Sequence, residues 1–262
     1  PNRLVHIFTL PEDGGTPRQI TSGDYHHGGQ LQWAPDGKKI IFSTNRRTDW
    51  EYEPNDSDVY EIAVSDGSFR QITKRQGPDN SPVLSPDGKK IAYTGYDDRY
   101  QGYQVTHLYI MSRDGSNSKM ITKSLDRSVG SPIWSGDGKG VYVSYNDKGN
   151  GKVAYAPVKG KIKLLTNNLG GTSIGRPYSS GSFTVAKDGN IAYTISRPDR
   201  PADIAISGMK GGAPRKITSL NDDLFGHKNL ASVEEIWYKS SHDGRDIQGW
   251  ITKPPGFDPK IK

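Results

Sequence analysis

Apolar residues along the chain fall into short stretches separated by turns rich in Gly, Pro and Asp. Within one fifty-residue segment there are four such stretches, at Ser81–Leu84, Lys90–Thr94, His107–Met111 and Lys119–Thr122. Short apolar runs bounded by turn residues are typical of β-strands. The segment therefore predicts four short strands joined by tight turns.

A turn sequence and a strand-end sequence recur along the chain in phase with each other. An Asp followed by Gly stands at Asp36, Asp87, Asp137 and Asp188, with steps of 51, 50 and 51 residues. An aliphatic residue followed by Thr recurs at Ile20-Thr21, Ile72-Thr73, Ile121-Thr122, Leu165-Thr166 and Ile217-Thr218. Asp-Gly suits hairpin turns because Asp bonds the backbone ahead of it and Gly accepts a positive φ. Two markers with one period indicate an internal repeat.

Four strands in a repeat of this length are typical of β-propeller blades. We predict an all-β propeller with about four complete blades, at 30–74, 81–123, 131–166 and 181–218. Residues 4–21 resemble only the last two strands of a blade, so we expect the chain to be N-terminally truncated and to start inside a propeller. Two series of large residues are predicted to pack between blades: Trp33, Leu84, Trp134 and Val185, and Phe42, Tyr93, Tyr142 and Tyr193.

The repeat stops after Thr218. Alternation over 233–251 predicts a hairpin that turns at Asp243-Gly244, with Ile236 and Tyr238 on one face. The following Pro254-Pro255 cannot continue a central strand, because Pro donates no backbone hydrogen bond. We expect the propeller to occupy 1–230 and the first strands of a second domain to occupy 231–262, where that domain is cut off.

Composition excludes several classes of partner and cofactor. The 35 Lys and Arg against 29 Asp and Glu give a net charge of +6, but the basic residues form no stripe, so no nucleic acid is expected. No apolar run approaches the length that spans a bilayer, so no membrane partner is expected. The chain has no Cys, and the pair His26-His27 lacks a third ligand at a recognisable spacing. We expect no metal and no cofactor.

The junction over 233–259, together with the blade connections 45–60 and 95–109, resembles prolyl oligopeptidase-family serine peptidases, particularly the acylaminoacyl-peptidase and dipeptidyl-peptidase-like bacterial members. The resemblance implies a propeller that caps an α/β-hydrolase domain and admits short peptides but not folded proteins. The expected partners are short peptides and the chain's own downstream hydrolase domain.

In that fold the catalytic partners follow in the order Ser, Asp, His, with the Ser on a strand-to-helix elbow. The resemblance therefore places the triad downstream of Lys262 and predicts no catalytic residue in this chain, which alone is expected to be inactive. The stretch Gly171–Gly175 matches the elbow pattern, but neither a strand before it nor a helix after it is indicated. We do not expect Ser173 to be a nucleophile.

The connection from Arg46 to Asp58 is longer than a hairpin needs, and such loops often carry function. If it faces the hydrolase domain, Arg46 or Arg47 would hold a substrate carbonyl or carboxylate. Glu51 or Glu53 would hold a free peptide amine by a charge-assisted bond. The alternative is a solvated loop whose charges pair with one another. The loop 96–103 is a second candidate, and the acidic residues at 55–58 and 97–98 are interpreted as turn residues.

A rival interpretation is a non-catalytic propeller of the TolB type that acts as a protein-binding module. The segment 233–259 separates the two hypotheses, since a pure binding propeller does not need the hairpin and its Pro-rich tail. An open ring exposes blade edges, so we expect the isolated chain to be marginally stable or to self-associate as a homo-oligomer.

Overall fold

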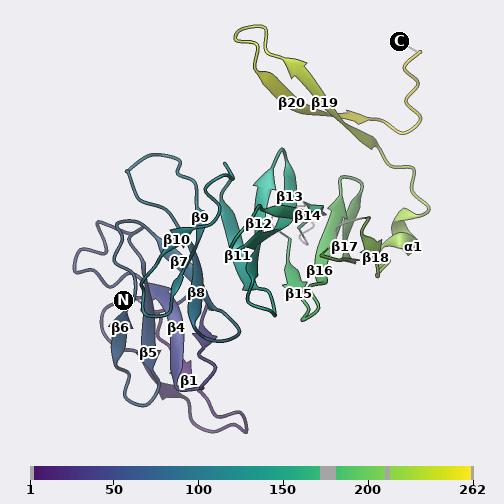
Figure 1. Cartoon of the computed structure of the whole chain (residues 1–262). Helices are drawn as coiled ribbons and strands as arrows, with labels where there is room; N and C mark the ends of the chain where they lie inside the picture. Colours follow the sequence, from purple (N-terminus) through teal and green to yellow (C-terminus); the bar gives the residue numbers. More distant parts are fainter. Residues whose placement is uncertain (1–2, 172–180, 210–212, 261–262) are drawn as a thin grey trace. The chain divides into compact units, whose positions relative to one another are not determined.

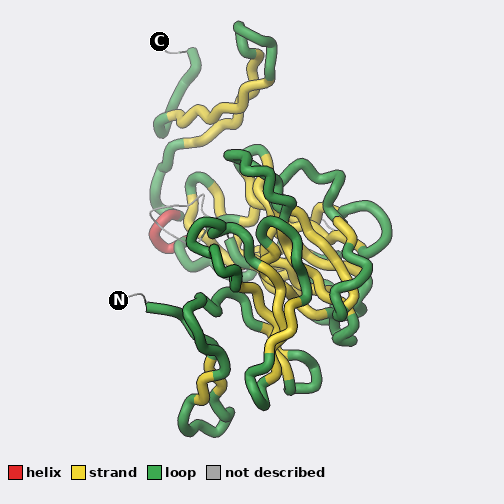
Figure 2. The backbone as a smooth tube through the Cα atoms, turned by 90° about the vertical axis from the view of Figure 1, so that its left-hand side faces the viewer, coloured by secondary structure: helices red, strands yellow, loops and turns green. Residues whose placement is uncertain are grey.

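The structure is a computed structural model that describes residues 3–171, 181–209 and 213–260. Strands make up nearly all of the regular structure (Figures 1 and 2), and in these ranges the one helix is α1 (Asp222–Phe225). No helix in the described ranges is long and apolar enough to cross a bilayer. The chain divides into two compact units. The first contains the described residues up to Tyr145, with Val153–Leu164 and Lys187–Gly189, and the second contains the other described residues from Asn146 onward.

The first unit begins with a hairpin and two four-stranded antiparallel sheets (Figure 1). The hairpin consists of β1 (Phe8–Thr9) and β2 (Arg18–Gln19). The first sheet contains, in order, β3 (Gln32–Trp33), β4 (Lys39–Thr44), β5 (Asp58–Ala63) and β6 (Phe69–Gln71). The second contains β7 (Asp79–Leu84), β8 (Lys90–Gly95), β9 (His107–Ser112) and β10 (Lys119–Met120). The predicted repeat of four strands is confirmed in these two sheets, and β1 and β2 pair with each other as an antiparallel hairpin.

Eight further strands follow at the predicted period, but they belong to one sheet and not to two separate ones as predicted for 131–166 and 181–218, because Leu169 pairs with Ile195. They are β11 (Val129–Trp134), β12 (Gly140–Asp147), β13 (Asn150–Pro157) and β14 (Lys163–Leu169), then β15 (Phe183–Val185), β16 (Ile191–Arg197), β17 (Arg200–Ser207) and β18 (Arg215–Lys216). The predicted hairpin is also present, formed by β19 (Ser232–Lys239) and β20 (Asp246–Lys253). Its register pairs Ile236 with Gly249 and Tyr238 with Ile247.

The recurring Asp-Gly sequence forms the turn between the first two strands of a sheet. The Oδ1 atoms of Asp36, Asp87 and Asp137 accept the backbone N–H two residues ahead at 3.0, 3.1 and 3.0 Å. The following glycines all have φ near 66°, a conformation that other residues seldom adopt. Each turn is thus encoded by two adjacent residues.

The recurring Thr bonds the third strand in four of its five positions, whereas Thr166 bonds Asn168 and the Tyr193 hydroxyl instead. The Oγ1 atoms of Thr21, Thr73, Thr122 and Thr218 accept the backbone N–H groups of Ile7, Val59, Leu108 and Ile204 at 2.8, 2.9, 2.9 and 2.8 Å. The hydroxyl satisfies a strand N–H that a short fourth strand leaves without a ladder partner. This bond explains why Thr recurs at one place in the repeat.

Apolar clusters fill the spaces between successive sheets of the first unit. One joins Ile41 and Val59 to Ile91 and Met111, and another joins the next pair of sheets. The series Phe42, Tyr93, Tyr142 and Tyr193 is buried as predicted. Trp33 differs, since half of its surface is exposed. Its strand has two residues, and its side chain borders an open hollow of about 490 Å³ that Leu84 and Trp134 also line.

Candidate functional site

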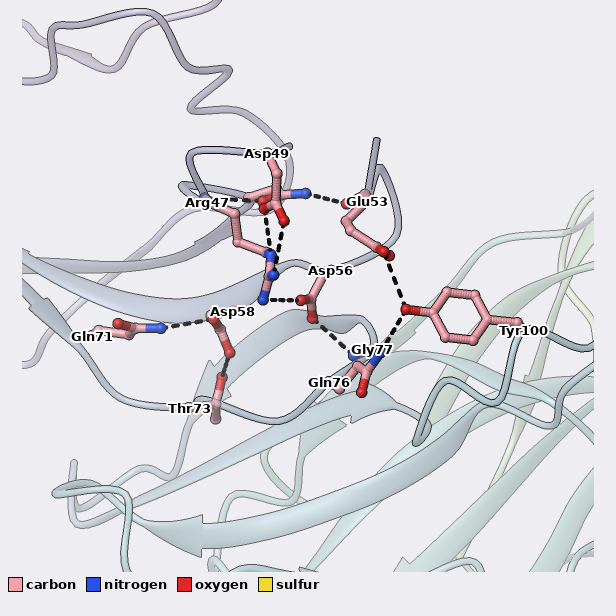
Figure 3. A network of polar contacts seen from close by, with 11 residues as sticks. Arg47, Asp49, Glu53, Asp56, Asp58, Gln71, Thr73, Gln76, Gly77 and Tyr100 are labelled. Atoms are coloured by element: carbon pink, nitrogen blue, oxygen red, sulfur yellow. Dashed lines mark hydrogen bonds and ion pairs between the residues drawn. The ribbon is translucent and has the colours of Figure 1, made fainter. Parts of the chain in front are cut away.

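Two long loops of the first unit meet at one end of adjacent sheets (Figure 3). Loop 45–57 joins β4 to β5, and loop 96–106 joins β8 to β9, so both connect the second strand to the third. The two loops are linked directly by a hydrogen bond of 3.1 Å from the Tyr100 hydroxyl to Glu53 Oε1. We call loops 45–57 and 96–106 the loop pair.

Arg47 is held by carboxylates of its own loop (Figure 3). Its Nε and Nη2 atoms donate to the two oxygens of Asp49 at 2.8 and 3.1 Å, and its Nη1 lies 2.8 Å from Asp56 Oδ2. Asp56 is buried and also accepts the backbone N–H of Gly77 at 2.8 Å. The guanidinium therefore fixes the loop to its base. For Arg47, this agrees with the alternative interpretation, in which the charges of the loop pair with one another.

Arg46 turns toward aromatic side chains and not toward the tip of the loop. Its guanidinium lies 4.7 Å from the Tyr25 ring centre and 4.2 Å from that of Phe69, and it bonds His27 Nε2. Burial and the neighbouring Arg46 charge lower the pKa of His27 to about 4, so this imidazole is neutral at pH 7. Both predicted arginines thus have intramolecular partners.

The two predicted glutamates lie differently in the loop. Glu51 is exposed in the turn near the tip. Glu53 is half-buried, and its carboxylate accepts the Tyr100 hydroxyl while its backbone carbonyl accepts Asn45 Nδ2 at 2.6 Å. A carboxylate has several acceptor positions, so one neutral donor leaves Glu53 able to accept further hydrogen bonds.

The interpretation of residues 55–58 as turn residues is wrong for Asp58. Asp58 is the first residue of β5 and is buried, where it accepts Thr73 Oγ1 at 3.0 Å and Gln71 Nε2 at 2.7 Å. Burial raises its pKa to about 6, although both hydrogen bonds act in the opposite direction. Asp58 directly precedes Val59, whose N–H bonds the repeated Thr73. The repeat could therefore have placed Asp58 in the strand and not in the turn.

Asp79 is a second buried carboxylate beneath the loop pair. It bonds Arg75, whose guanidinium also lies 3.4 Å from Asp97 and 4.2 Å from the Tyr109 ring centre. Burial raises the pKa of Asp79 to about 6, against the opposing effect of Arg75. Tyr100 lies in the candidate loop 96–103, but its bond to Glu53 could not be predicted, because the two residues are 47 positions apart. Asp79 was not predicted, although its partner Arg75 lies only four residues before it.

Other candidates from the sequence are outside the site. Ser173 lies outside the described residues. Across the described ranges, no three His, Cys, Asp or Glu side chains are grouped so as to hold a metal ion. The arrangement that remains is a polar loop pair with a glutamate, Glu53, whose carboxylate is bonded by the other loop.

Two four-stranded sheets followed by eight further antiparallel strands at the same period define a β-propeller domain. The family described as Dipeptidyl peptidase IV (DPP IV) N-terminal region matches residues 4–99, which include the whole of loop 45–57. Dipeptidyl-peptidase 5 of Porphyromonas gingivalis is 26% identical over 88% of this chain and 33% of its own length. Dipeptidyl-peptidase 5 of Trichophyton schoenleinii is 28% identical over 90% of this chain and 33% of its own length.

Solved structures agree on the fold. An acylaminoacyl peptidase structure superposes with a TM-score of 0.63 at 19% identity, covering 86% of this chain and 32% of that one. TolB from Acinetobacter baumannii superposes with a TM-score of 0.56 at 20% identity, covering 94% and 56%. The sequence matches confirm the resemblance to prolyl oligopeptidase-family peptidases, and the superpositions confirm the propeller fold. The chain spans about a third of the length of the curated relatives it matches.

Proposed function

We propose that this chain is the substrate-gating portion of a serine peptidase that hydrolyses short peptides as an acylaminoacyl- or dipeptidyl-peptidase-like exopeptidase. The observation that carries the proposal is the similarity to dipeptidyl-peptidases across 88 to 90% of the chain. A serine outside residues 1–262 would attack the peptide carbonyl, with a histidine as general base. The chain alone would then be inactive.

The charges of residues 45–58 favour a cationic group of the substrate. Residues 45–58 carry five carboxylates and two arginines, and both arginines are engaged within the chain. Glu53 is ordered and Glu51 is exposed, so the two glutamates are suited to hold a protonated peptide amine. Arg47 would have to release Asp49 before it bound a substrate carboxylate, and Arg46 would have to leave His27.

The hairpin β19–β20 supports the proposed second domain over 231–262. One face carries Ile236, Tyr238, Ile247 and Ile251, because directly paired residues of an antiparallel hairpin share a face. Tyr238, Ile247 and Ile251 are 55, 36 and 43% exposed. Neighbouring apolar side chains on one exposed face are typical of a surface that another element covers.

The test is to express the complete reading frame that contains this chain, beside residues 1–262 alone, and to treat both with a fluorophosphonate probe for activated serines. We expect labelling of the longer protein alone, at a serine beyond Lys262, with hydrolysis of dipeptidyl or acylaminoacyl substrates. Labelling of neither protein would contradict the peptidase proposal. Labelling at Ser173 would contradict the assignment of the nucleophile to the downstream region.

A second candidate is a TolB-like protein-binding propeller, which the superposition of TolB on 94% of the chain favours. That likeness shows the fold alone, whereas the dipeptidyl-peptidase similarity is one of sequence. Absence of labelling, together with capture of a specific protein partner by the propeller, would favour this candidate.

A further inference from the structure

Tyr100 has a backbone conformation that a bulky residue rarely adopts. Its φ is 54°, in the left-handed region, which is costly for a side chain with a Cβ atom. The conformation is held locally, since Asp98 Oδ1 accepts the Tyr100 N–H at 2.8 Å and also accepts Gln104 Nε2 at 2.7 Å. Gln104 Oε1 in turn accepts the Arg99 N–H at 2.7 Å.

Core packing does not explain this conformation, because the Tyr100 side chain is 68% exposed. Its position is instead determined at the hydroxyl, which accepts Gln76 Nε2 at 2.7 Å and donates to Glu53 Oε1 at 3.1 Å (Figure 3). A phenol is protonated at neutral pH, and the hydrogen bond to Glu53 raises the pKa of the Tyr100 phenol further, so the hydroxyl is available as a donor. The strained loop 96–106 thus presents a donor to one carboxylate of loop 45–57.

We propose that Tyr100 is a positioning residue for Glu53, supported by Asp98, Gln104 and Gln76, and that loop 96–106 thereby determines how tightly the amine site binds its substrate. This inference rests on the proposed function, since it assigns Glu53 to the peptide amine. An unrestrained glutamate loses rotamer freedom when it binds a ligand, and a fixed one has lost that freedom already. Tyr100 acts through Glu53 and does not contact the reacting bond.

The experiment compares Tyr100→Phe with Tyr103→Phe in the complete protein. Both changes remove one hydroxyl from an exposed tyrosine of the same loop, and Tyr103 is 70% exposed. The substrates are a dipeptidyl p-nitroanilide with a free amine and its N-acetylated form. Because one hydrogen bond to a charged group is lost, we expect Tyr100→Phe to raise KM for the free-amine substrate by about fivefold to tenfold, with kcat unchanged. Tyr103→Phe should change neither constant.

The outcomes separate the inference from the proposed function. If Glu53→Gln raises KM for the free-amine substrate and Tyr100→Phe does not, the positioning role is overturned and the amine site stands. If Glu53→Gln leaves KM unchanged, the amine site fails and the inference fails with it. Equal effects of Tyr100→Phe on both substrates, with a lower Tm, would show a merely structural role and overturn the inference.

If the complete protein hydrolyses neither substrate, peptide binding is measured directly. Isothermal titration with a dipeptide amide and its N-acetylated form is then made on the same variants. Weaker binding of the free-amine peptide to Tyr100→Phe than to Tyr103→Phe supports the inference. Equal binding to both variants, or no preference for the free amine, overturns it.

Discussion

Glu61 and Asp58 are buried carboxylates of the same strand, β5, with opposite surroundings. Glu61 is 2% exposed and lies 2.7 Å from Lys39, 3.2 Å from Arg70 and 2.8 Å from Arg113. Burial raises its pKa, but the hydrogen bonds from Lys39 and Arg113 together with the charges of Arg113 and Arg70 outweigh burial and hold the pKa below its usual value. Asp58 has only the neutral donors Thr73 and Gln71, so burial prevails and its pKa rises to about 6. The partners of each buried carboxylate therefore determine how its contribution to the free energy of unfolding varies with pH.

At the residue scale, we expect Asp58→Asn to gain stability relative to the unsubstituted protein as pH rises from about 4 to 6. The folded pKa of Asp58 is above its ordinary value of 3.8, so the folded state binds more protons in this window and its stability falls as pH rises. The relative gain is at most about 3 kcal/mol. Urea unfolding at several pH values measures it. Asp66→Asn is the control and should show the opposite trend, because hydrogen bonds from Ser68 lower the pKa of Asp66. The same trend in both variants would contradict the raised pKa of Asp58.

Glu61→Gln should destabilise the protein at pH 7 by roughly 2 kcal/mol, because three cations lose their shared partner. The folded pKa of Glu61 is lowered, so its contribution is present above its unfolded pKa and is lost as pH falls through the folded value. The difference between the two proteins should therefore shrink at low pH. Thermal unfolding at pH 7 and pH 3 measures it. Asp246→Asn, which removes an exposed pair with Lys239, should cost about 0.5 kcal/mol or less; an equal cost would contradict the burial argument.

At the scale of the strand, the repeated Thr determines how the fourth strand of a sheet joins the third. Thr122 is fully buried and accepts the Leu108 N–H at 2.9 Å. We expect Thr122→Val to lower the free energy of unfolding by about 1–3 kcal/mol, because a buried N–H loses its acceptor. Thr122→Ser keeps the hydroxyl and should retain most of that stability. Denaturant unfolding of both variants measures the effect, and equal losses would attribute it to packing alone.

At the scale of the whole molecule, a propeller that gates a peptidase limits access by size. We expect the complete protein to cleave a peptide of a few residues and to leave the same sequence uncleaved when it is inserted in a folded protein. Mass spectrometry of both digests measures the difference, with trypsin cleavage at an exposed Lys in the same insert as the control for access. Equal cleavage of both substrates would rule out gating by the propeller.

Much of the fold could be predicted from the sequence, because the elements that define it are encoded locally. Asp-Gly makes the first turns at Asp36, Asp87 and Asp137 with its own carboxylate and a positive φ, and the bond of Thr73 lies within one hairpin of strands. The strands β7–β10 and the hairpin β19–β20 occur where the pattern predicts them. The loop pair was indicated only by its length and its charged and aromatic residues.

The sequence by itself determined the repeat, the strands, their turns and the buried series at Phe42, Tyr93, Tyr142 and Tyr193. Only the tertiary structure decided that Arg47 bonds Asp56, that Tyr100 donates to Glu53, and that half of the Trp33 surface is exposed. The physical reason is the sequence separation over which each interaction acts. Turn and strand propensities act between neighbours in the chain, whereas Tyr100 and Glu53 are 47 residues apart and meet only because two sheets pack side by side.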